Sequence, residues 1–191
     1  KSVTPSRHGD DPEYAFDHPM TQEAIYAVVS AEDRRYAHKQ VGQWLDARGE
    51  GDLLPTARHH DLGGRPALAV PGYLQAARLA LFGRDTVAVH AWAERGAASG
   101  AAVGPLARLL ETRADAWMTV GELEAACGAI LQASSLQPRD VGLALKRIRI
   151  ETTLAAAQGQ VQTAQQAAEA LLRLPTPEAA PADFARTACV V

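Results

Sequence analysis

The stretch Gly83-Arg-Asp-Thr-Val-Ala88 has two counterparts further along the chain, Gly121-Glu-Leu-Glu-Ala-Ala126 and Gly159-Gln-Val-Gln-Thr-Ala164. Successive glycines are 38 residues apart, and each is followed by an alanine at the same distance. Glycine suits a tight turn between helices, and alanine lets two helix backbones approach closely. A fixed period is typical of stacked helix pairs, because one pair cannot bury its apolar face alone. The sequence therefore predicts helix pairs with turns at these three glycines.

The composition of the chain also favours helices. Of its 191 residues, 47% are apolar but only 5% are aromatic, and much of the apolar fraction is alanine, the best helix former. Val, Ile, Thr, Tyr and Phe never alternate with polar residues over a long run, which argues against a sheet. We therefore predict an all-α fold.

Local signals place three helices before the repeats. Thr21 is positioned to cap a first helix, and Ser30 to cap a second helix that ends at Arg48-Gly49. The stretch from Leu53 to Leu62 is expected to form a short helix that Gly63-Gly64 stops. The residues expected on the buried side of the second helix are Tyr36, Val41, Trp44 and Leu45.

The middle repeat resembles a tetratricopeptide repeat most clearly. Its matching residues are Leu110, Ala114 and Trp117 in the first helix, and Gly121, Ala126, Ile130, Ala133 and Pro138 in the turn, the second helix and its stop. That family usually repeats every ~34 residues, so the longer spacing implies that one helix per unit is a turn longer. Two residues depart from the pattern: Arg113 replaces an apolar residue, and Gly72 stands where the other units have Leu110 and Ile148.

The resemblance implies a short helical junction followed by a tetratricopeptide-like right-handed α-solenoid of about three helix pairs. It places Trp92, Trp117 and Ile130 between helices, where we expect them to be buried. The first helices of successive pairs would line a concave face, which is where such arrays hold their ligands.

A second resemblance covers residues 14–48. The strings Tyr14-Ala-Phe-Asp-His-Pro-Met-Thr-Gln-Glu-Ala-Ile-Tyr26, Ala31-Glu-Asp-Arg-Arg-Tyr-Ala-His38 and Val41-Gly-Gln-Trp-Leu45 resemble a junction in large bacterial signal-transduction ATPases of the STAND type. Some of these carry a serine/threonine kinase or cyclase domain. In that family the stretch ends a winged-helix domain and precedes helical repeats. The first helices of those repeats are resembled by two further strings, Thr56-Ala-Arg-His-His-Asp-Leu-Gly-Gly64 and Tyr73-Leu-Gln-Ala-Ala77. The family's nucleotide-binding domain is not part of this sequence.

These patterns divide the chain into four parts. Residues 1–13 are expected to be a flexible N-terminal segment, and 14–50 a helical junction that ends a winged-helix-like domain. Residues 51–174 would hold the tetratricopeptide-like repeats, and 175–191 a Pro-rich linker with the start of a truncated helix. Because the chain starts at Lys1 and stops where a new helix pattern opens, we expect a segment of a larger protein.

Charge and motifs speak against several classes of function. The formal net charge of −3 does not favour nucleic acid or an acidic membrane. No apolar run approaches ~18 residues, no signal peptide is visible, and the two cysteines suit a reducing compartment. The sequence contains no phosphate loop, no His-Glu-x-x-His and no Gly-x-Ser-x-Gly. We therefore expect a cytoplasmic chain without catalytic residues, cofactor or nucleotide binding.

Histidines and a basic strip are the candidate ligand-binding groups. His59-His60-Asp61 and His90 suggest a metal site, but adjacent helical residues point about 100° apart. We therefore expect one histidine of the pair to pack between helices and the other to lie at the surface. The second group comprises Arg34, Arg35, His38 and Lys39, which would either meet a phosphate or nucleic acid or form a solvated face balanced by Glu32 and Asp33.

Two further residues have alternative roles. In some STAND proteins a winged-helix histidine touches the bound nucleotide, so the resemblance offers His18 as a nucleotide-sensing candidate; the alternative is a capping or core histidine. Cys127 follows Ala126 on the inner side of its helix and is expected to be a small buried hydrophobe.

Binding of a protein, a peptide or another domain of the same polypeptide is the function that the sequence favours. The chain would be a sensor or autoinhibitory arm of a larger signalling ATPase or kinase–ATPase fusion. Alternatively, it belongs to an ATPase- or kinase-class enzyme whose catalytic domain is missing here, or to a transcription regulator. The partner-binding candidates are Gln75, Arg78, Arg113, Arg147 and Glu151. Three arginines along one groove would favour an acidic partner; alternatively, each pairs with a nearby acid such as Glu111, Asp115 or Glu151.

Overall fold

The computed structural model describes residues 2–4, 13–49 and 53–172, and within them the chain forms nine helices and one small sheet. The predicted helical class is confirmed. The sheet is not predicted by the sequence pattern: β1 (Ser2–Thr4) pairs antiparallel with β2 (Glu13–Ala15). The segment expected to be flexible thus carries strand residues near both of its ends. The linker expected at 175–191 lies outside the described residues.

The first two helices begin with different capping arrangements. In α1 (Pro19–Val28), Pro19 occupies the first turn and His18 is the N-cap residue, so Thr21 lies inside the helix and the prediction that it caps the helix is wrong. In α2 (Ala31–Arg48), the Ser30 hydroxyl accepts a hydrogen bond from the Asp33 N–H at 3.0 Å, as predicted. Gly49 ends α2 in the left-handed conformation, with φ 65°.

Most of the apolar side chains expected on the buried side of α2 are exposed. Leu45 is buried, but Tyr36 is 63% exposed and Trp44 is 40% exposed. Helix α1 has no buried residue at all. The prediction holds only for Leu45, because α3 (Leu53–Leu62), with which α2 makes its main contacts, leaves Tyr36 and Trp44 exposed.

Six longer helices follow α3 and are joined by short turns. They are α4 (Pro66–Phe82), α5 (Thr86–Ala98), α6 (Val103–Val120), α7 (Leu123–Leu136), α8 (Val141–Ala157) and α9 (Val161–Leu172). The glycines at 83, 121 and 159 lie in the α4–α5, α6–α7 and α8–α9 turns, which confirms the predicted turn positions.

The three turn glycines do not share one backbone conformation. Gly121 and Gly159 are left-handed, with φ of 81° and 70°, a region that favours glycine. Gly83 has φ −73°, and the left-handed residue of its turn is Arg84, with φ 59°. The glycine pattern therefore locates the turns correctly, but the first turn is closed by a different residue.

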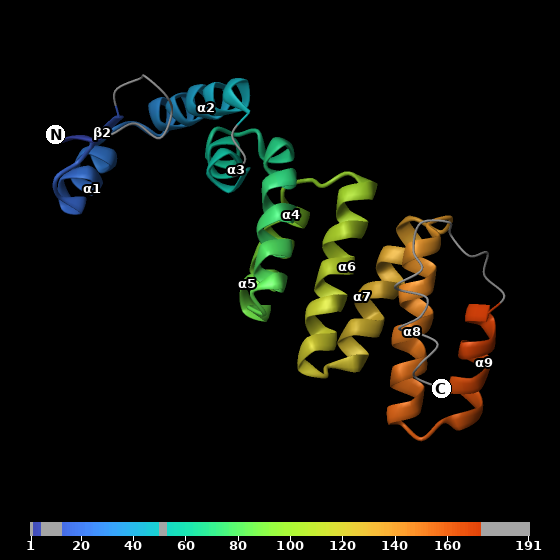
Figure 1. Cartoon of the computed structure of the whole chain (residues 1–191). Coiled ribbons are helices and arrows are strands. Elements are labelled where there is room, and N and C mark those ends of the chain that lie inside the picture. The colour runs from blue at the N-terminus through green and yellow to red at the C-terminus, as the bar shows by residue number, and fades with distance from the viewer. Residues whose placement is uncertain (1, 5–12, 50–52, 173–191) are drawn as a thin grey trace.

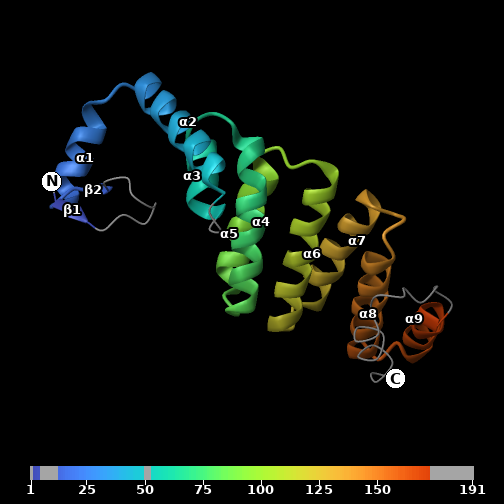
Figure 2. The ribbon, with the colours of Figure 1, turned by 45° about the horizontal axis from the view of Figure 1, so that its top comes forward.

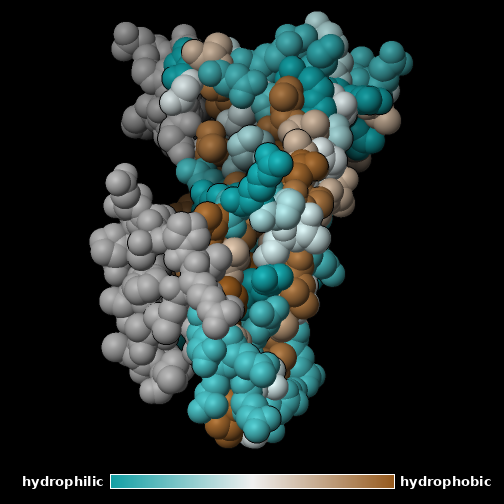
Figure 3. Space-filling view, turned by 90° about the vertical axis from the view of Figure 1, so that its right-hand side faces the viewer, coloured by the Kyte–Doolittle hydropathy of each residue, from teal (hydrophilic) through white to brown (hydrophobic). Residues whose placement is uncertain are grey.

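Helices α3 to α9 follow one another in chain order across the molecule (Figures 1 and 2). Each contacts the next along the chain, and α4 also contacts α6. Side chains are mixed at the α8–α9 end, where hydrophobic residues are interspersed with hydrophilic ones (Figure 3). Contacts between sequence neighbours thus account for most of the packing, as expected for helix pairs.

The core consists of small clusters between adjacent helices. The largest joins α6, α7 and α8 and contains Ala107, Ala114, Ala126, Ile130, Ala133, Leu143 and Ile150. A second comprises Ala57, Ala69 and Tyr73, and a third comprises Val70, Ala93 and Leu109. Ile130 is buried as predicted, whereas Trp92 and Trp117 are only half-buried at the edges of clusters.

Gly72 has a packing role that its weak fit to the repeat pattern does not reveal. It lies where α4 crosses α3, and a Cβ at this position would be 2.4 Å from the Leu53 carbonyl oxygen and 2.5 Å from the Ala57 Cβ. A larger residue, such as those found at the equivalent positions of α6 and α8, would push the two helices apart. The departure from the repeat pattern therefore follows from the close approach of α3.

Candidate functional site

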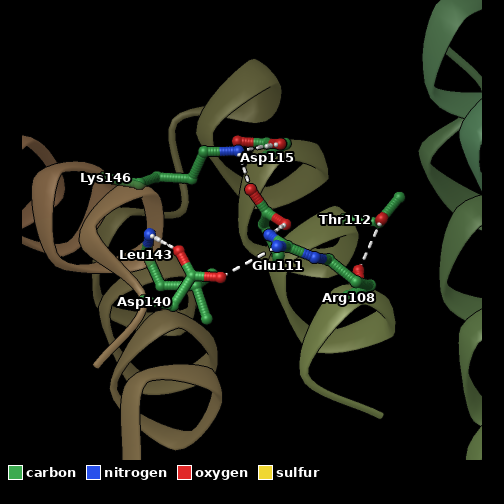
Figure 4. Close-up of polar contacts among 7 residues, drawn as sticks. All are labelled: Arg108, Glu111, Thr112, Asp115, Asp140, Leu143 and Lys146. Carbon is green, nitrogen blue, oxygen red and sulfur yellow. Dashed lines mark hydrogen bonds and ion pairs between the residues drawn. The ribbon is translucent and has the colours of Figure 1, made fainter. Parts of the chain in front are cut away.

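A network of charged side chains joins α6 to α8 (Figure 4). The Lys146 ammonium donates to Glu111 at 2.7 Å and to Asp115 at 2.8 Å. The Arg108 guanidinium donates to Glu111 at 2.9 Å and to Asp140 at 2.8 Å. Because Asp140 also caps the start of α8 by accepting from the Leu143 N–H, the network fixes the first turn of α8 against α6.

The charges of the network stabilise one another in a partly buried place. Burial alone would raise the pKa of Glu111, but Lys146 and then Arg108 more than compensate and lower that pKa. Burial alone would lower the pKa of Lys146, but Asp115 and Glu111 outweigh it and raise that pKa. The charged forms of Glu111 and Lys146 are therefore favoured, and their oxygens and protons are engaged in the network.

A hollow opens beside this network where the ends of α4, α6 and α8 meet. It has a volume of about 570 Å³ and is lined by Leu81, Arg84, Asp115, Met118, Thr119, Arg149 and Thr153; these residues are called the α4–α6–α8 groove below. Leu81 and Met118 are its apolar part, while Arg84 and Arg149 supply positive charge. Asp115 belongs to both the groove and the network.

The two groove arginines have no acidic partner among the described residues. Asp115, the one acid in the lining, is bonded to Lys146. The Nε of Arg149 is buried and has no hydrogen-bond partner within the described part of the chain. A buried arginine without a compensating acid is costly, so a carboxylate that reached this guanidinium would stabilise it.

None of the predicted partner-binding residues lines the α4–α6–α8 groove. Gln75 accepts a hydrogen bond from the Leu53 N–H at 3.0 Å and so holds the start of α3, while Arg78 is exposed on α4. Arg113 faces Glu94 of α5 at 3.6 Å. Arg147 lies 3.8 Å from Glu151 on its own helix. Arg113 and Arg147 thus each lie near an acid, as the alternative of local pairing expects. The role of the five predicted residues in partner binding stays a prediction.

Two of the three predicted arginines lie two positions before a residue that lines the groove. Arg113 precedes Asp115, and Arg147 precedes Arg149, by two positions, which is about 200° around a helix. Arg147 instead borders a second hollow of about 340 Å³ beside the end of α7. Sequence reasoning missed Arg84, Lys146 and Arg149, because the repeat register does not reveal which side of each first helix stays uncovered.

The histidines lie in two separate places. His60 is 2% exposed, and its Nδ1 accepts from Arg65 at 3.2 Å while its Nε2 donates to Asp46 at about 3.0 Å. The guanidinium can only donate, so His60 carries its proton on Nε2. His59 is half-buried and contacts His38, whereas His90 stacks on Trp117 with ring centroids 3.9 Å apart. One histidine of the adjacent pair is thus packed inside, as expected.

The described residues contain no group of three His, Cys, Asp or Glu placed to hold a metal ion. His18 precedes α1 in an extended conformation, and its side chain makes no capping hydrogen bond. Its proposed nucleotide-sensing role stays a prediction. Cys127 is half-buried, and burial raises the pKa of its thiol, so it packs as a small hydrophobe. Cys189 lies outside the described residues.

The basic strip of α2 is divided between two faces. Arg34 lies over the Tyr26 ring, 4.9 Å from its centroid, and His38 bonds to the Tyr26 hydroxyl at 2.9 Å, so both face α1. Arg35 and Lys39 instead line a third hollow together with Arg65. The strip is therefore neither one continuous binding face nor a uniformly solvated one.

Comparisons with known proteins found no matching family model, no matching curated protein and no matching solved structure. The two family resemblances therefore stay sequence-based predictions. In the part of the chain that the structure describes, no helix combines the length and apolar character needed to cross a membrane.

Proposed function

We propose that this chain is a non-catalytic binding module whose α4–α6–α8 groove holds an acidic segment of another protein or of the same polypeptide. The observation that carries the proposal is the pair of groove arginines without an acidic partner, Arg84 and Arg149, beside the apolar Leu81 and Met118. An extended segment with a carboxylate next to an aliphatic side chain would complement both features.

The arrangement of the helices supports a role in binding. Helices α4, α6 and α8 are the first members of three helix pairs, and the groove takes lining residues from all three. We propose that the pairs form a tetratricopeptide-like right-handed α-solenoid and that the groove belongs to its concave face. A surface built from several repeats suits an extended ligand, because each repeat contributes a few contacts.

The chemistry of the network supports a structural role for its carboxylates. A general acid or base works best with a pKa near the operating pH, whereas Lys146 and Arg108 lower the pKa of Glu111. Asp115 and Asp140 are likewise bonded to cations. These acids are better suited to holding α6 and α8 together than to moving protons.

The wider assignment rests on the resemblance of residues 14–48 to a STAND junction. We propose that the chain serves as a cytoplasmic sensor or autoinhibitory arm of a signal-transduction ATPase, or of its fusion to a serine/threonine kinase. In this proposal the residues at 14–50 end a winged-helix-like domain. Two alternatives to this assignment remain. The chain could instead be a segment of an ATPase- or kinase-class enzyme, or a segment of a transcription regulator.

Selection from a random peptide display library tests the binding function. The wild-type chain should enrich peptides that share an acidic residue beside an aliphatic one, and Arg84→Glu with Arg149→Glu should abolish their binding. The matched control is Arg139→Glu, which reverses an exposed charge in the α7–α8 turn, outside the groove. Failure to enrich any peptide, or equal binding to the groove variant, would contradict the proposal.

A further inference from the structure

A basic hollow lies at the start of α4, where it meets α2 and the end of α3, whereas the groove lies at the other end of α4. It has a volume of about 380 Å³ and is lined by Glu32, Arg35, Tyr36, Lys39, Gly63, Gly64 and Arg65; these residues are called the basic hollow below. Three of the side chains are cations and one is an acid. Within the described residues, neither Arg35 nor Lys39 takes part in an ion pair, so their charges are available.

The Gly63–Gly64 turn allows the cations to gather. A Cβ on Gly63 would lie 2.8 Å from the Lys39 backbone nitrogen, so only glycine lets the end of α3 approach α2 this closely. A Cβ on Gly64 would lie 2.3 Å from the Arg35 Nε, which shows that the guanidinium rests on this glycine. Arg35 and Lys39 are four residues apart on one face of α2, so both reach the same hollow.

Arg65 is held in place by groups behind it. It donates to the Lys39 carbonyl oxygen at 3.0 Å and to His60 at 3.2 Å, and His60 is in turn bonded to Asp46. The Nε of Arg65 is buried and lacks a hydrogen-bond partner among the described residues. A guanidinium fixed in this way needs little reorganisation to bind an anion.

The surrounding backbone does not oppose an anion. The carbonyl groups of His59, His60 and Asp61 at the end of α3 accept hydrogen bonds from the N–H groups of residues 63–65. Arg65 is the N-cap residue of α4, and no side chain caps that end, which carries partial positive charge. The lining contains three cations, and the carboxylate of Glu32 offsets one of them, so the net charge of the lining is two positive charges.

We propose that the basic hollow is a binding site for a phosphate group, with Arg35, Lys39 and Arg65 as its cationic ligands and the exposed Tyr36 hydroxyl as a further donor. Guanidinium groups match the geometry of phosphate oxygens, and a dianion would balance the two excess charges. This site involves none of the groove residues, so it stands or falls independently of the proposed peptide binding.

Nuclear magnetic resonance titration of the full chain with inorganic phosphate tests the site, with sodium chloride added to hold ionic strength constant. The amide signals of Gly63, Gly64 and Arg65 should shift and saturate. The variant Arg35→Gln with Lys39→Gln should bind at least about tenfold more weakly, since it removes two charge-assisted hydrogen bonds to the phosphate. Both residues are exposed, so the variant should fold, which circular dichroism would verify.

The matched control is Arg58→Gln with Arg139→Gln, which removes the same total charge from exposed positions outside the basic hollow and the groove. It should bind phosphate like the wild type. Shifts that do not saturate, or equal weakening in the two double variants, would overturn the proposal, because they would indicate a general charge effect.

A phosphoserine peptide and its unphosphorylated twin identify the source of the phosphate group. Binding of the phosphopeptide about tenfold more tightly than inorganic phosphate, with no binding of the twin, would assign the site to a phosphorylated protein. Equal affinity for phosphopeptide and inorganic phosphate would assign it to a small phosphorylated molecule. Binding of the twin as strong as that of the phosphopeptide would overturn the site, because the phosphate group would then contribute nothing.

Discussion

The Nδ1 atom of His38 lies 3.0 Å from the Nδ1 atom of His59 and joins α2 to α3. One ring must donate and the other accept, and the Tyr26 hydroxyl on the Nε2 of His38 can serve either tautomer. A second proton would place two N–H groups face to face. The contact between α2 and α3 therefore depends on at least one of these rings staying neutral.

Acid should weaken the fold through this histidine pair. Burial lowers the pKa of both rings, and His38 and His60 lower that of His59 further. The unfolded chain, with histidine pKa values near 6.5, then binds more protons than the folded chain as the pH falls. The free energy of unfolding in urea should therefore be smaller at pH 5.5 than at pH 7.5.

The histidine contribution can be separated with two variants. His59→Gln should reduce the difference between the two pH values, whereas His18→Gln, which changes an exposed residue before α1, should leave it unchanged. An unfolding free energy that is independent of pH in this range, or that rises toward acid, would contradict the prediction.

Removing the ammonium of Lys146 should destabilise the α6–α8 contact. Lys146→Met leaves Glu111 and Asp115 without their shared cation, and we expect a loss of about 1–3 kcal/mol at pH 7 by urea unfolding. Lys39→Met, at an exposed position, should change stability by less than about 0.5 kcal/mol. Equal effects of the two substitutions would show that the network contributes little.

The Lys146→Met effect should also depend on pH. In the wild type the pKa of Glu111 is lowered, so its stabilising contribution is present above the unfolded pKa and is lost as the pH falls through the folded pKa. The difference in unfolding free energy between wild type and variant should therefore narrow as the pH falls below 4.5, the ordinary pKa of a glutamate. A constant difference would indicate that Lys146 acts through packing alone.

Two glycine-to-alanine substitutions should change stability in opposite directions. Neither Gly121 nor Gly128 has a neighbour within 4 Å of an added Cβ, so backbone conformation decides the outcome. Gly121→Ala should cost about 1–2 kcal/mol because φ is 81°, and Gly128→Ala in the middle of α7 should stabilise by about 0.5–1 kcal/mol. Thermal unfolding of both variants would test this, and shifts of the same sign would contradict it.

The core between α6, α7 and α8 can be tested at two neighbouring residues. Ile130 is fully buried and Leu131 is 42% exposed. Ile130→Ala should reduce the free energy of unfolding by about 2–5 kcal/mol, and Leu131→Ala by less than about 1 kcal/mol. A larger loss at Leu131 would mean that the helix is rotated relative to the described packing.

The turn positions could be predicted because they depend on local sequence. Glycines at a fixed spacing mark the ends of helices, and Ser30 caps α2 through a hydrogen bond to a residue three positions away. The helix from Leu53 to Leu62 also begins and ends where the sequence indicates. In each case the signal and its structural consequence lie within a few residues of each other.

The faces of the helices could not be predicted in the same way. Tyr36 is 63% exposed and Trp44 is 40% exposed, although the Arg48 guanidinium lies 4.3 Å from the centroid of the Trp44 ring. Arg149 rather than Arg147 lines the groove because of the rotation of α8 against α6, which the Lys146 network fixes. Both facts depend on contacts between elements that are distant in the sequence, to which the repeat period is insensitive.

The core clusters share no residue, yet α6 contributes to two of them, through Leu109 on one side and Ala107 and Ala114 on the other. Helix α6 is therefore packed on both sides and is the element that these two clusters have in common. A ligand held in the groove would touch α4 and α8 as well as α6, so it would bridge two clusters that the core joins through α6.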